Sequence, residues 1–290
     1  MQLIYYFIII IIIALVIIIY PILIKNTDIL QFEKYYNENI TNIINKPFSN
    51  TTPKDREIPL KIFQTWKTKD LKPGMLDAVN MIKDTNPDFT HYLYDNDDCR
   101  AFIEKYFDKD VLTAFDCLIP GAYKADLWRY CVLYIYGGIY LDIKFIPVNG
   151  FKLINLIDKE HFCLDIINSW TNEDYGLYNA IMITKPNNII LKECIDRIVI
   201  NVKNKYYGKS ALEPTGPILL GQIYFNKHNL PLTDIKLFIY FSNNIAAQII
   251  YNKHPILEMY PTYREEQDHN TNNKSYSQLW REKAIYGNCF

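Results

Sequence analysis

The 290-residue sequence lacks an excess of charge of either sign. Its 31 Lys and Arg residues are balanced by 32 Asp and Glu residues, which leaves a formal net charge of −1. This balance argues against a nucleic-acid-binding surface and against an acidic solvating tail, because both need a strong excess of one sign. The chain is therefore expected to recognise its partners at individual sites.

The sequence also lacks closely spaced cysteine pairs. Its six cysteines are scattered, with no CxxC pair and no His/Cys spacing of a zinc site. Buried free thiols are one interpretation; in an oxidising lumen some cysteines could pair, and spacing alone does not say which.

One long apolar run without charge stands at the N-terminus, from Leu3 to Ile24. As a helix it would be about 33 Å long, enough to cross a bilayer core of about 30 Å. The run exceeds a usual signal-peptide core and no small-x-small cleavage site follows it, which favours a retained single-pass anchor in the lipid bilayer. Lys25 follows the run and no basic residue precedes it, so the orientation stays open, as does the choice between a Golgi/ER-type and a host or viral membrane.

The rest of the chain is predicted to form a stem and one folded domain. Residues 25–57 are polar and lack a long apolar period, which indicates a stem. Residues 58–290 are enough for a single α/β domain with a sizeable core. The predicted organisation is a transmembrane anchor over residues 1–24, a stem over 25–57 and a catalytic domain over 58–290.

Strand-like and helix-like segments alternate along this domain, as in a doubly wound α/β sheet. The main segments expected as strands are 58–66, 89–94, 139–145 and 177–183, and those expected as helices are 73–83, 98–106, 122–136 and 187–200. Gly137-Gly138 ends the helix over 122–136 and leads directly into the strand over 139–145. In an open α/β sheet, ligands bind beyond the carboxyl ends of strands, so Asp142 near the end of this strand is expected to meet a ligand.

The polar residues around the double glycine are predicted to share one site. Residues two apart on a strand point the same way, so Tyr140, Asp142 and Lys144 face one side. Asp126 and Arg129 are three apart on the preceding helix and share a surface. Asp126 could accept sugar hydroxyls while Arg129 counters phosphate; taken alone, the two could equally be a surface ion pair.

At this point the sequence resembles a known family. The run Ala125-Asp-Leu-Trp-Arg129, followed by Tyr136-Gly-Gly-Ile-Tyr-Leu-Asp142, is similar to the signature of family 32 glycosyltransferases, the group with a sugar-binding region containing a DXD motif. That family includes the yeast initiating α-1,6-mannosyltransferase and capsular polysaccharide enzymes, and is related to clostridial toxin glucosyltransferase domains. The resemblance extends from Ile58 to about Tyr286.

The resemblance implies a GT-A type nucleotide-sugar-binding fold, Rossmann-like, with a mostly parallel sheet flanked by helices. It also implies retaining transfer of a hexose from a UDP- or GDP-sugar to a glycan, glycolipid or protein acceptor. Carried over to this sequence, Trp66 stacks on the nucleotide base, Asp126 and Arg129 hold the donor sugar and phosphate, and Asp142 is the first DXD carboxylate. Tyr140 would line the same pocket.

Two further residues are carried over from a looser match. Trp280 and His269 would belong to a C-terminal segment that closes over the diphosphate. In this interpretation Trp280 contributes to donor binding, and His269 is a weak candidate metal ligand.

One position departs from the family pattern, because Lys144 stands where the second DXD carboxylate is expected. That carboxylate is a principal ligand of Mn²⁺ or Mg²⁺ in relatives, and a lysine repels a cation there. Either Asp142 and groups from the C-terminal segment still hold a metal, or Lys144 supplies positive charge to the leaving group.

The departure at Lys144 also keeps a second function open. The chain could be a non-catalytic, membrane-tethered glycan-binding or scaffold protein with a degenerate DXD motif. A glycoside hydrolase is less favoured, because no pair of carboxylates suited to flank a glycosidic bond stands out.

Overall fold

The computed structural model describes residues 30–166, 175–241, 247–267 and 274–289. The predicted anchor at 3–24 and His269 lie outside these residues. Within the described ranges, no helix has the length and apolar character needed to cross a membrane.

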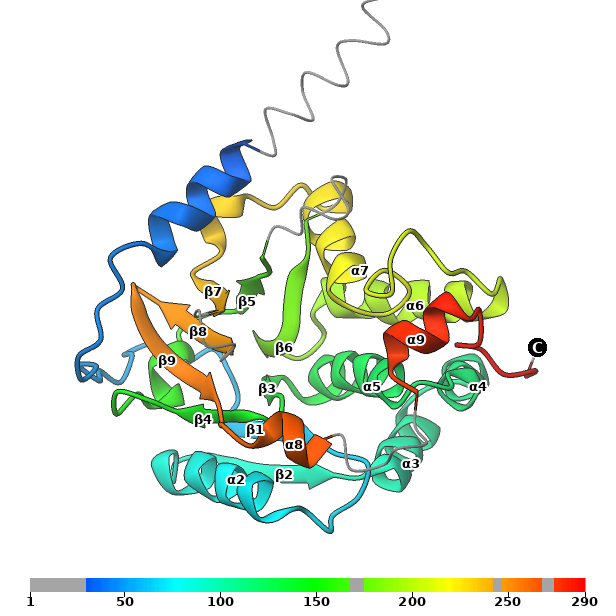
Figure 1. Cartoon of the computed structure of the whole chain (residues 1–290), viewed down its shortest axis with the longest axis horizontal. Coiled ribbons are helices and arrows are strands. Elements are labelled where there is room, and N and C mark those ends of the chain that lie inside the picture. Colours follow the sequence, from blue (N-terminus) through cyan, green and yellow to red (C-terminus); the bar gives the residue numbers. More distant parts are fainter. Residues whose placement is uncertain (1–29, 167–174, 242–246, 268–273, 290) are drawn as a thin grey trace, which may run out of the picture.

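A nine-stranded mixed sheet forms the centre of the described structure, with the strand order β2-β1-β3-β6-β5-β7-β8-β9-β4 (Figure 1). The strands are β1 (Lys61–Thr65), β2 (Thr90–Tyr94), β3 (Gly138–Leu141), β4 (Phe145–Pro147), β5 (His161–Leu164), β6 (Leu177–Thr184), β7 (Leu237–Phe241), β8 (Ala247–Tyr251) and β9 (His254–Met259). The helices are α2 (Pro73–Thr85), α3 (Asn96–Tyr106), α4 (Lys109–Cys117), α5 (Gly121–Tyr136), α6 (Ile189–Lys203), α7 (Pro217–Gly221), α8 (Tyr263–Gln267) and α9 (Tyr276–Arg281).

The expectation of a mostly parallel sheet is wrong. β1 is parallel to β2 and β3, and β5 is parallel to β7, but the other five neighbouring pairs are antiparallel. The connection between β8 and β9 shows why: only Asn252 and Lys253 join these strands, both with positive φ, and parallel neighbours would need a crossover of a dozen residues or more.

The strand expected over 139–145 is two strands. β3 ends at Leu141 and pairs with β1 and β6, whereas β4 begins at Phe145 and pairs with β9. Asp142 and Lys144 therefore lie in the turn between the strands, where the Phe145 N–H donates to the Asp142 carbonyl. Asp142, expected inside the strand near its end, instead directly follows the end of β3.

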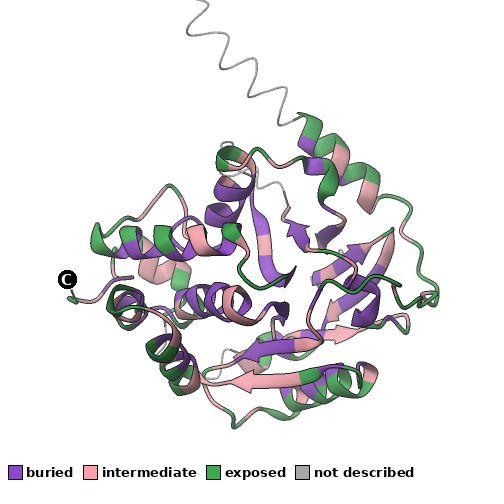
Figure 2. Cartoon of the chain, turned by 180° about the vertical axis from the view of Figure 1, so that it is seen from behind, coloured by how far each residue is buried: buried purple, intermediate pink, exposed green. Residues whose placement is uncertain are grey.

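The core covers both faces of the sheet, and Figure 2 shows its strands largely buried. Alternate strand residues face opposite sides. Phe63 and Tyr140 join the cluster formed with α3, α4, α5 and α6, whereas Ile62 and Ile139 join the cluster formed with α2. β1 and β3 are therefore apolar on both faces, which is why their sequences read as buried.

A helix over residues 30–40, within the segment interpreted as a stem, packs on the domain (dark blue in Figure 1). The Phe32 ring stacks on Tyr175 with 3.5 Å between centroids. The Tyr36 hydroxyl donates to the Ile239 carbonyl at 2.6 Å, and the Tyr35 hydroxyl donates to the Ile235 carbonyl at 2.8 Å. This part of the segment therefore contacts the domain through three aromatic residues at helical spacing, and Tyr36 bonds directly to β7.

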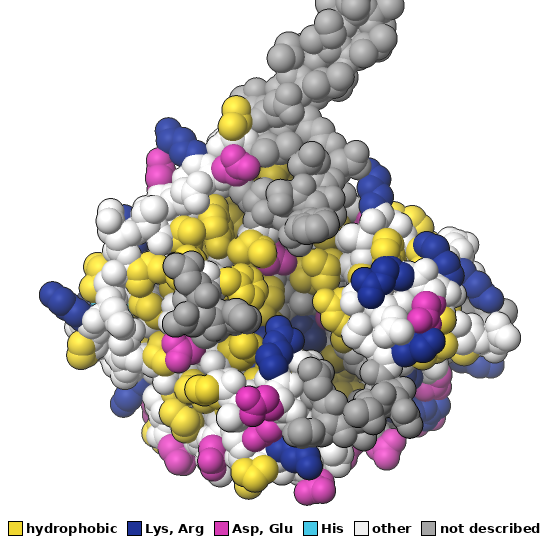
Figure 3. Space-filling model, in the orientation of Figure 1, with side chains coloured by type: hydrophobic (Ala, Val, Ile, Leu, Met, Phe, Trp, Pro, Cys, Tyr) yellow, Lys and Arg dark blue, Asp and Glu magenta, His cyan; other side chains and the backbone are white. Residues whose placement is uncertain are grey.

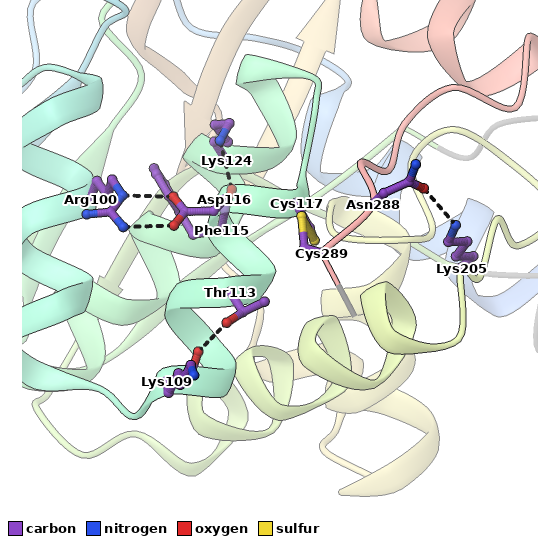
Figure 4. Close-up of a disulfide and its surroundings, with 10 residues drawn as sticks. All are labelled: Arg100, Lys109, Thr113, Phe115, Asp116, Cys117, Lys124, Lys205, Asn288 and Cys289. Atoms are coloured by element: carbon purple, nitrogen blue, oxygen red, sulfur yellow. Dashed lines mark hydrogen bonds and ion pairs between the residues drawn. A yellow bond between two sulfur atoms is a disulfide. The ribbon is translucent and has the colours of Figure 1, made fainter.

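A disulfide joins Cys117 at the end of α4 to Cys289 near the C-terminus (Figure 4). The Gly287 N–H donates to the Cys117 carbonyl, so backbone pairing supports the same contact. The other four cysteines are buried and free. The sequence left the pairing open, and the structure selects two cysteines 172 residues apart.

We predict that Cys289→Ser lowers the free energy of unfolding by about 2–4 kcal/mol, because the crosslink restricts the unfolded chain. Urea unfolding of the full chain, followed by tryptophan fluorescence, measures the change. Wild-type protein treated with reductant should unfold at the same urea concentration as the variant. An unchanged midpoint for both samples would contradict the assignment of this disulfide.

Candidate active site

A cavity of about 560 Å³ opens at the carboxyl ends of β1, β3 and β5. Its lining includes six residues selected from the sequence: Trp66, Asp126, Arg129, Tyr140, Asp142 and Lys144. Figure 3 shows this face of the molecule, where hydrophobic and basic side chains meet around a hollow. The structure therefore gathers these side chains from β1, α5, β3 and the turn after β3 around one space.

Asp126 is buried in α5, and both of its carboxylate oxygens accept hydrogen bonds. The Asn179 amide donates to Oδ1 at 2.9 Å and the Thr215 hydroxyl donates to Oδ2 at 2.7 Å. Burial raises the pKa of Asp126, although Arg129 and these donors oppose that shift. Asp126 is thus a fixed part of the cavity wall, contrary to the simple surface pair that its spacing allowed.

Arg129 connects three elements around the cavity. Its Nη1 donates to the Asn179 carbonyl at 2.8 Å and lies 3.5 Å from Asp142 Oδ1, and its Nη2 lies 3.5 Å from Asp126 Oδ1. The guanidinium carbon also lies 4.4 Å from the centre of the Tyr140 ring. A buried guanidinium is costly unless it is paired, and here two carboxylates and an aromatic face share its charge.

Asp142 and Lys144 form the shortest ion pair of the cavity. Lys144 Nζ lies 2.6 Å from Asp142 Oδ2, while the Tyr140 hydroxyl donates to Oδ1 at 2.8 Å. Burial alone would raise the pKa of Asp142, but Lys144 and Arg129 outweigh it and lower the pKa. Burial alone would lower the pKa of Lys144, but Asp142 outweighs it and raises the pKa. Both side chains are therefore charged at neutral pH.

This arrangement does not fit a divalent metal ion. A divalent cation needs ligands whose negative charge is not already neutralised, yet Asp142 is paired with Lys144 at 2.6 Å and lies 3.5 Å from Arg129. The described residues also contain no group of three or more His, Cys, Asp or Glu arranged to hold an ion.

Of the two tryptophans predicted to bind the donor, only Trp66 lines the cavity. Trp66 follows β1, is half-buried and lines the cavity, with Tyr263 as an edge-on neighbour at 6.4 Å. Trp280 in α9 is not among the described cavity-lining residues, and its Nε1 donates to the Tyr207 carbonyl at 2.6 Å. The structure therefore brings Trp66, but not Trp280, to the other predicted site residues.

Sequence reasoning missed several polar residues of the cavity. Asn179 binds Asp126 from a position far along the chain, and no local pattern marks it. Thr215 also binds Asp126; it lies in the segment Pro214-Thr-Gly-Pro217, which resembles a turn of the family, but no role in the site was predicted for it. Asp165 directly follows the buried strand β5, as Asp142 follows β3, and this position after a strand could have identified it. Its Oδ1 accepts from the Ile166 N–H at 2.8 Å, and burial raises its pKa to about 6.

An α/β sheet with carboxylates, a guanidinium and an ammonium gathered at its strand ends can bind a ligand that carries hydroxyls and negative charge. Comparison with known proteins points to the glycosyltransferases. Residues 74–163 match the family described as "Glycosyltransferase sugar-binding region containing DXD motif". The resemblance predicted from the sequence is thereby confirmed, and the chain carries the region of a glycosyltransferase.

Curated relatives belong to the same class. The chain is 34% identical over 117 residues to inositol phosphoceramide mannosyltransferase 3 of Schizosaccharomyces pombe, covering 40% of this chain and 30% of that protein. It is 32% identical over 103 residues to the initiation-specific alpha-1,6-mannosyltransferase of Candida albicans, covering 33% and 26%. The matches thus span less than a third of either relative.

A solved structure titled PaToxG Glycosyltransferase aligns with a TM-score of 0.46 at 17% identity, covering 72% of this chain and 80% of that one.

We predict that Asp165→Asn stabilises the protein at neutral pH. A carboxyl whose folded pKa is about 6, against an ordinary 3.8, contributes most to stability below pH 4, and that contribution is lost as pH rises to 6. The free energy of unfolding of the variant should exceed that of the wild type by about 1–3 kcal/mol at pH 7, a range that allows for screening by water in the cavity. At pH 4 the two should be almost equal. Urea unfolding at both values measures this gain.

The exposed Asp70→Asn variant is the matched control and should show no such pH dependence. An equal effect of Asp165→Asn at pH 4 and pH 7 would show that Asp165 does not titrate as described.

Proposed function

We propose that this chain transfers a hexose from a UDP- or GDP-sugar to a glycan, glycolipid or protein acceptor, with retention of anomeric configuration. The observation that carries the proposal is the buried group of Asp126, Arg129, Asp142 and Lys144 on one wall of the cavity, with Trp66 lining the same space. A nucleoside diphosphate sugar offers a base to stack, two phosphates to neutralise and hydroxyls to bind, and these side chains match each part.

Each residue then has a defined task. Trp66 stacks on the nucleotide base. Arg129 and Lys144 face the diphosphate, while Asp126 and Asp142 accept hydrogen bonds from hydroxyls. Tyr140 holds Asp142 through its hydroxyl and supports Arg129 with its ring. The GT-A type of the fold belongs to the same proposal.

The proposed reaction is compatible with these positions. The bond between the anomeric carbon and the diphosphate oxygen breaks, and the electron pair stays on the diphosphate. The acceptor hydroxyl attacks from the same face, and its proton passes to the departing phosphate oxygen. Negative charge grows on the leaving group during this step, so fixed positive charge from Arg129 and Lys144 lowers the barrier.

The names of the curated relatives guide the choice of substrates. The two relatives described above are named mannosyltransferases, and the name of one includes inositol phosphoceramide. Mannose as the donor sugar and a lipid-linked acceptor are therefore the first substrates to test. A single-pass anchor at residues 1–24, followed by a stem to residue 57 and a catalytic domain over 58–290, would hold the enzyme at a membrane, where such acceptors lie.

We predict that the full chain, purified in detergent, hydrolyses one nucleotide sugar from a panel of UDP- and GDP-sugars. Asp142→Asn should lower this rate about 100-fold or more, because it unpairs Lys144 and disturbs the charge around the diphosphate. Released nucleotide is the readout, and the exposed Asp70→Asn variant should keep the wild-type rate. If the wild type shows no turnover and no donor binding, the non-catalytic glycan-binding function is favoured instead.

A second prediction concerns Trp66. Trp66→Ala should weaken nucleotide binding roughly 5- to 150-fold, because stacking on a base contributes about 1–3 kcal/mol. Trp66→Phe should retain most of the affinity, since it keeps an aromatic face. Calorimetric titration with UDP and GDP measures both variants, and equal affinity of the Ala variant and the wild type would remove Trp66 from the site.

A further inference from the structure

We propose that the Lys144 ammonium takes the place of a divalent cation, so that this site binds and releases a nucleoside diphosphate without metal. The inference rests on the proposed function and specifies how its leaving group is stabilised. It concerns the one position where the sequence departs from the DXD pattern.

The first step of the argument is charge. A second DXD carboxylate together with one divalent cation carries a single net positive charge. One lysine ammonium carries the same charge. Replacing the pair by Lys144 therefore leaves the formal charge facing the diphosphate unchanged, provided that Asp142 remains, and it does.

The second step is position. The Lys144 ammonium lies 2.6 Å from Asp142 Oδ2, so it occupies the space beside this carboxylate where a bound cation would stand. Its side chain is only 14% exposed, with the rings of Phe145 and Tyr178 each 5.3 Å from Nζ. The Tyr260 N–H also donates to the Lys144 carbonyl, which fixes the backbone. The charge is thus held at the cavity wall and largely shielded from solvent.

The third step is capacity for a ligand. An ammonium has three N–H donors, so it can keep its bond to Asp142 and still donate to phosphate oxygens. Lys144 lines the cavity, and Arg129 lies 3.5 Å from the other Asp142 oxygen, so two cations flank one carboxylate on the cavity wall. The formal charges of Arg129, Lys144, Asp126 and Asp142 sum to zero, so the wall offers a diphosphate two cationic groups with N–H donors and not an excess of positive charge.

The fourth step is the exclusion of a metal from this place. A divalent ion on Asp142 would have to displace the Lys144 ammonium and then remain close to it and to Arg129, against like-charge repulsion. The nearby Asp126 does not compensate, because its charge already faces Arg129 at 3.5 Å and Asn179 and Thr215 hold its oxygens in place. The donor set favours an ammonium over a metal.

The experiment uses the full chain in detergent and measures UDP and GDP affinity by calorimetry, together with donor hydrolysis, in EDTA and in Mn²⁺. We expect wild-type affinity and rate to change less than about twofold between the two conditions. Lys144→Met removes the charge at nearly the same length and should weaken nucleotide binding about tenfold or more in both conditions. The exposed Lys72→Met variant, outside the cavity lining, should bind as the wild type does.

Lys144→Asp restores a DXD sequence and provides the opposite test. Its nucleotide affinity should be about tenfold or more below that of the wild type in EDTA and should recover in Mn²⁺. This result would show that a carboxylate with its metal ion can replace the Lys144 ammonium. Wild-type binding and hydrolysis that vanish in EDTA and return with Mn²⁺ would overturn this inference and leave the proposed function intact. Failure of the wild type to bind either nucleotide in any condition would overturn both.

Discussion

The buried guanidinium of Arg129 holds the cavity wall together, since it meets Asp126 on its own helix, the Asn179 carbonyl of β6 and Asp142 after β3. Taking such charges out of water is costly, and only their mutual pairing offsets the cost. The ligand-facing groups therefore hold one another in position before any ligand arrives. Loss of one member would leave the others buried without a partner, so stability and binding are coupled at this point.

The double glycine explains how the cluster is assembled. Both glycines have positive φ, and a Cβ on Gly138 would lie 2.7 Å from the Lys61 carbonyl of β1. Only glycine lets the chain leave α5 and pair with β1 so soon afterwards. Because this turn is short, Arg129 of α5 and Asp142 after β3 reach each other.

By contrast, Asp165 is placed in the cavity at a cost to stability, which is common for groups kept for a ligand.

Features set by local sequence could be predicted, and those set by distant partners could not. The helix, double glycine and strand around Asp142 follow from neighbouring residues, so the sequence could group five residues that line one cavity: Asp126, Arg129, Tyr140, Asp142 and Lys144. The direction of β6 beside β3 and the bonds from Thr215 to Asp126 depend on segments many residues apart, which periodicity does not encode. The hairpin at Asn252-Lys253 was missed for another reason, because no glycine marks its positive φ angles.

Lys144 first suggested a degenerate motif and so supported a non-catalytic role. The geometry weakens that reasoning. If residue 144 had changed only by losing its metal-binding carboxylate, its side chain would not be expected to pair with Asp142. Instead an ammonium lies at ion-pair distance, shielded by two aromatic rings, with Arg129 on the other carboxylate oxygen. In the proposed reaction, the positive charge that a leaving diphosphate needs would therefore come from the protein itself. Departure from the DXD sequence at this position is compatible with turnover, and Lys144 alone gives no reason to infer its loss.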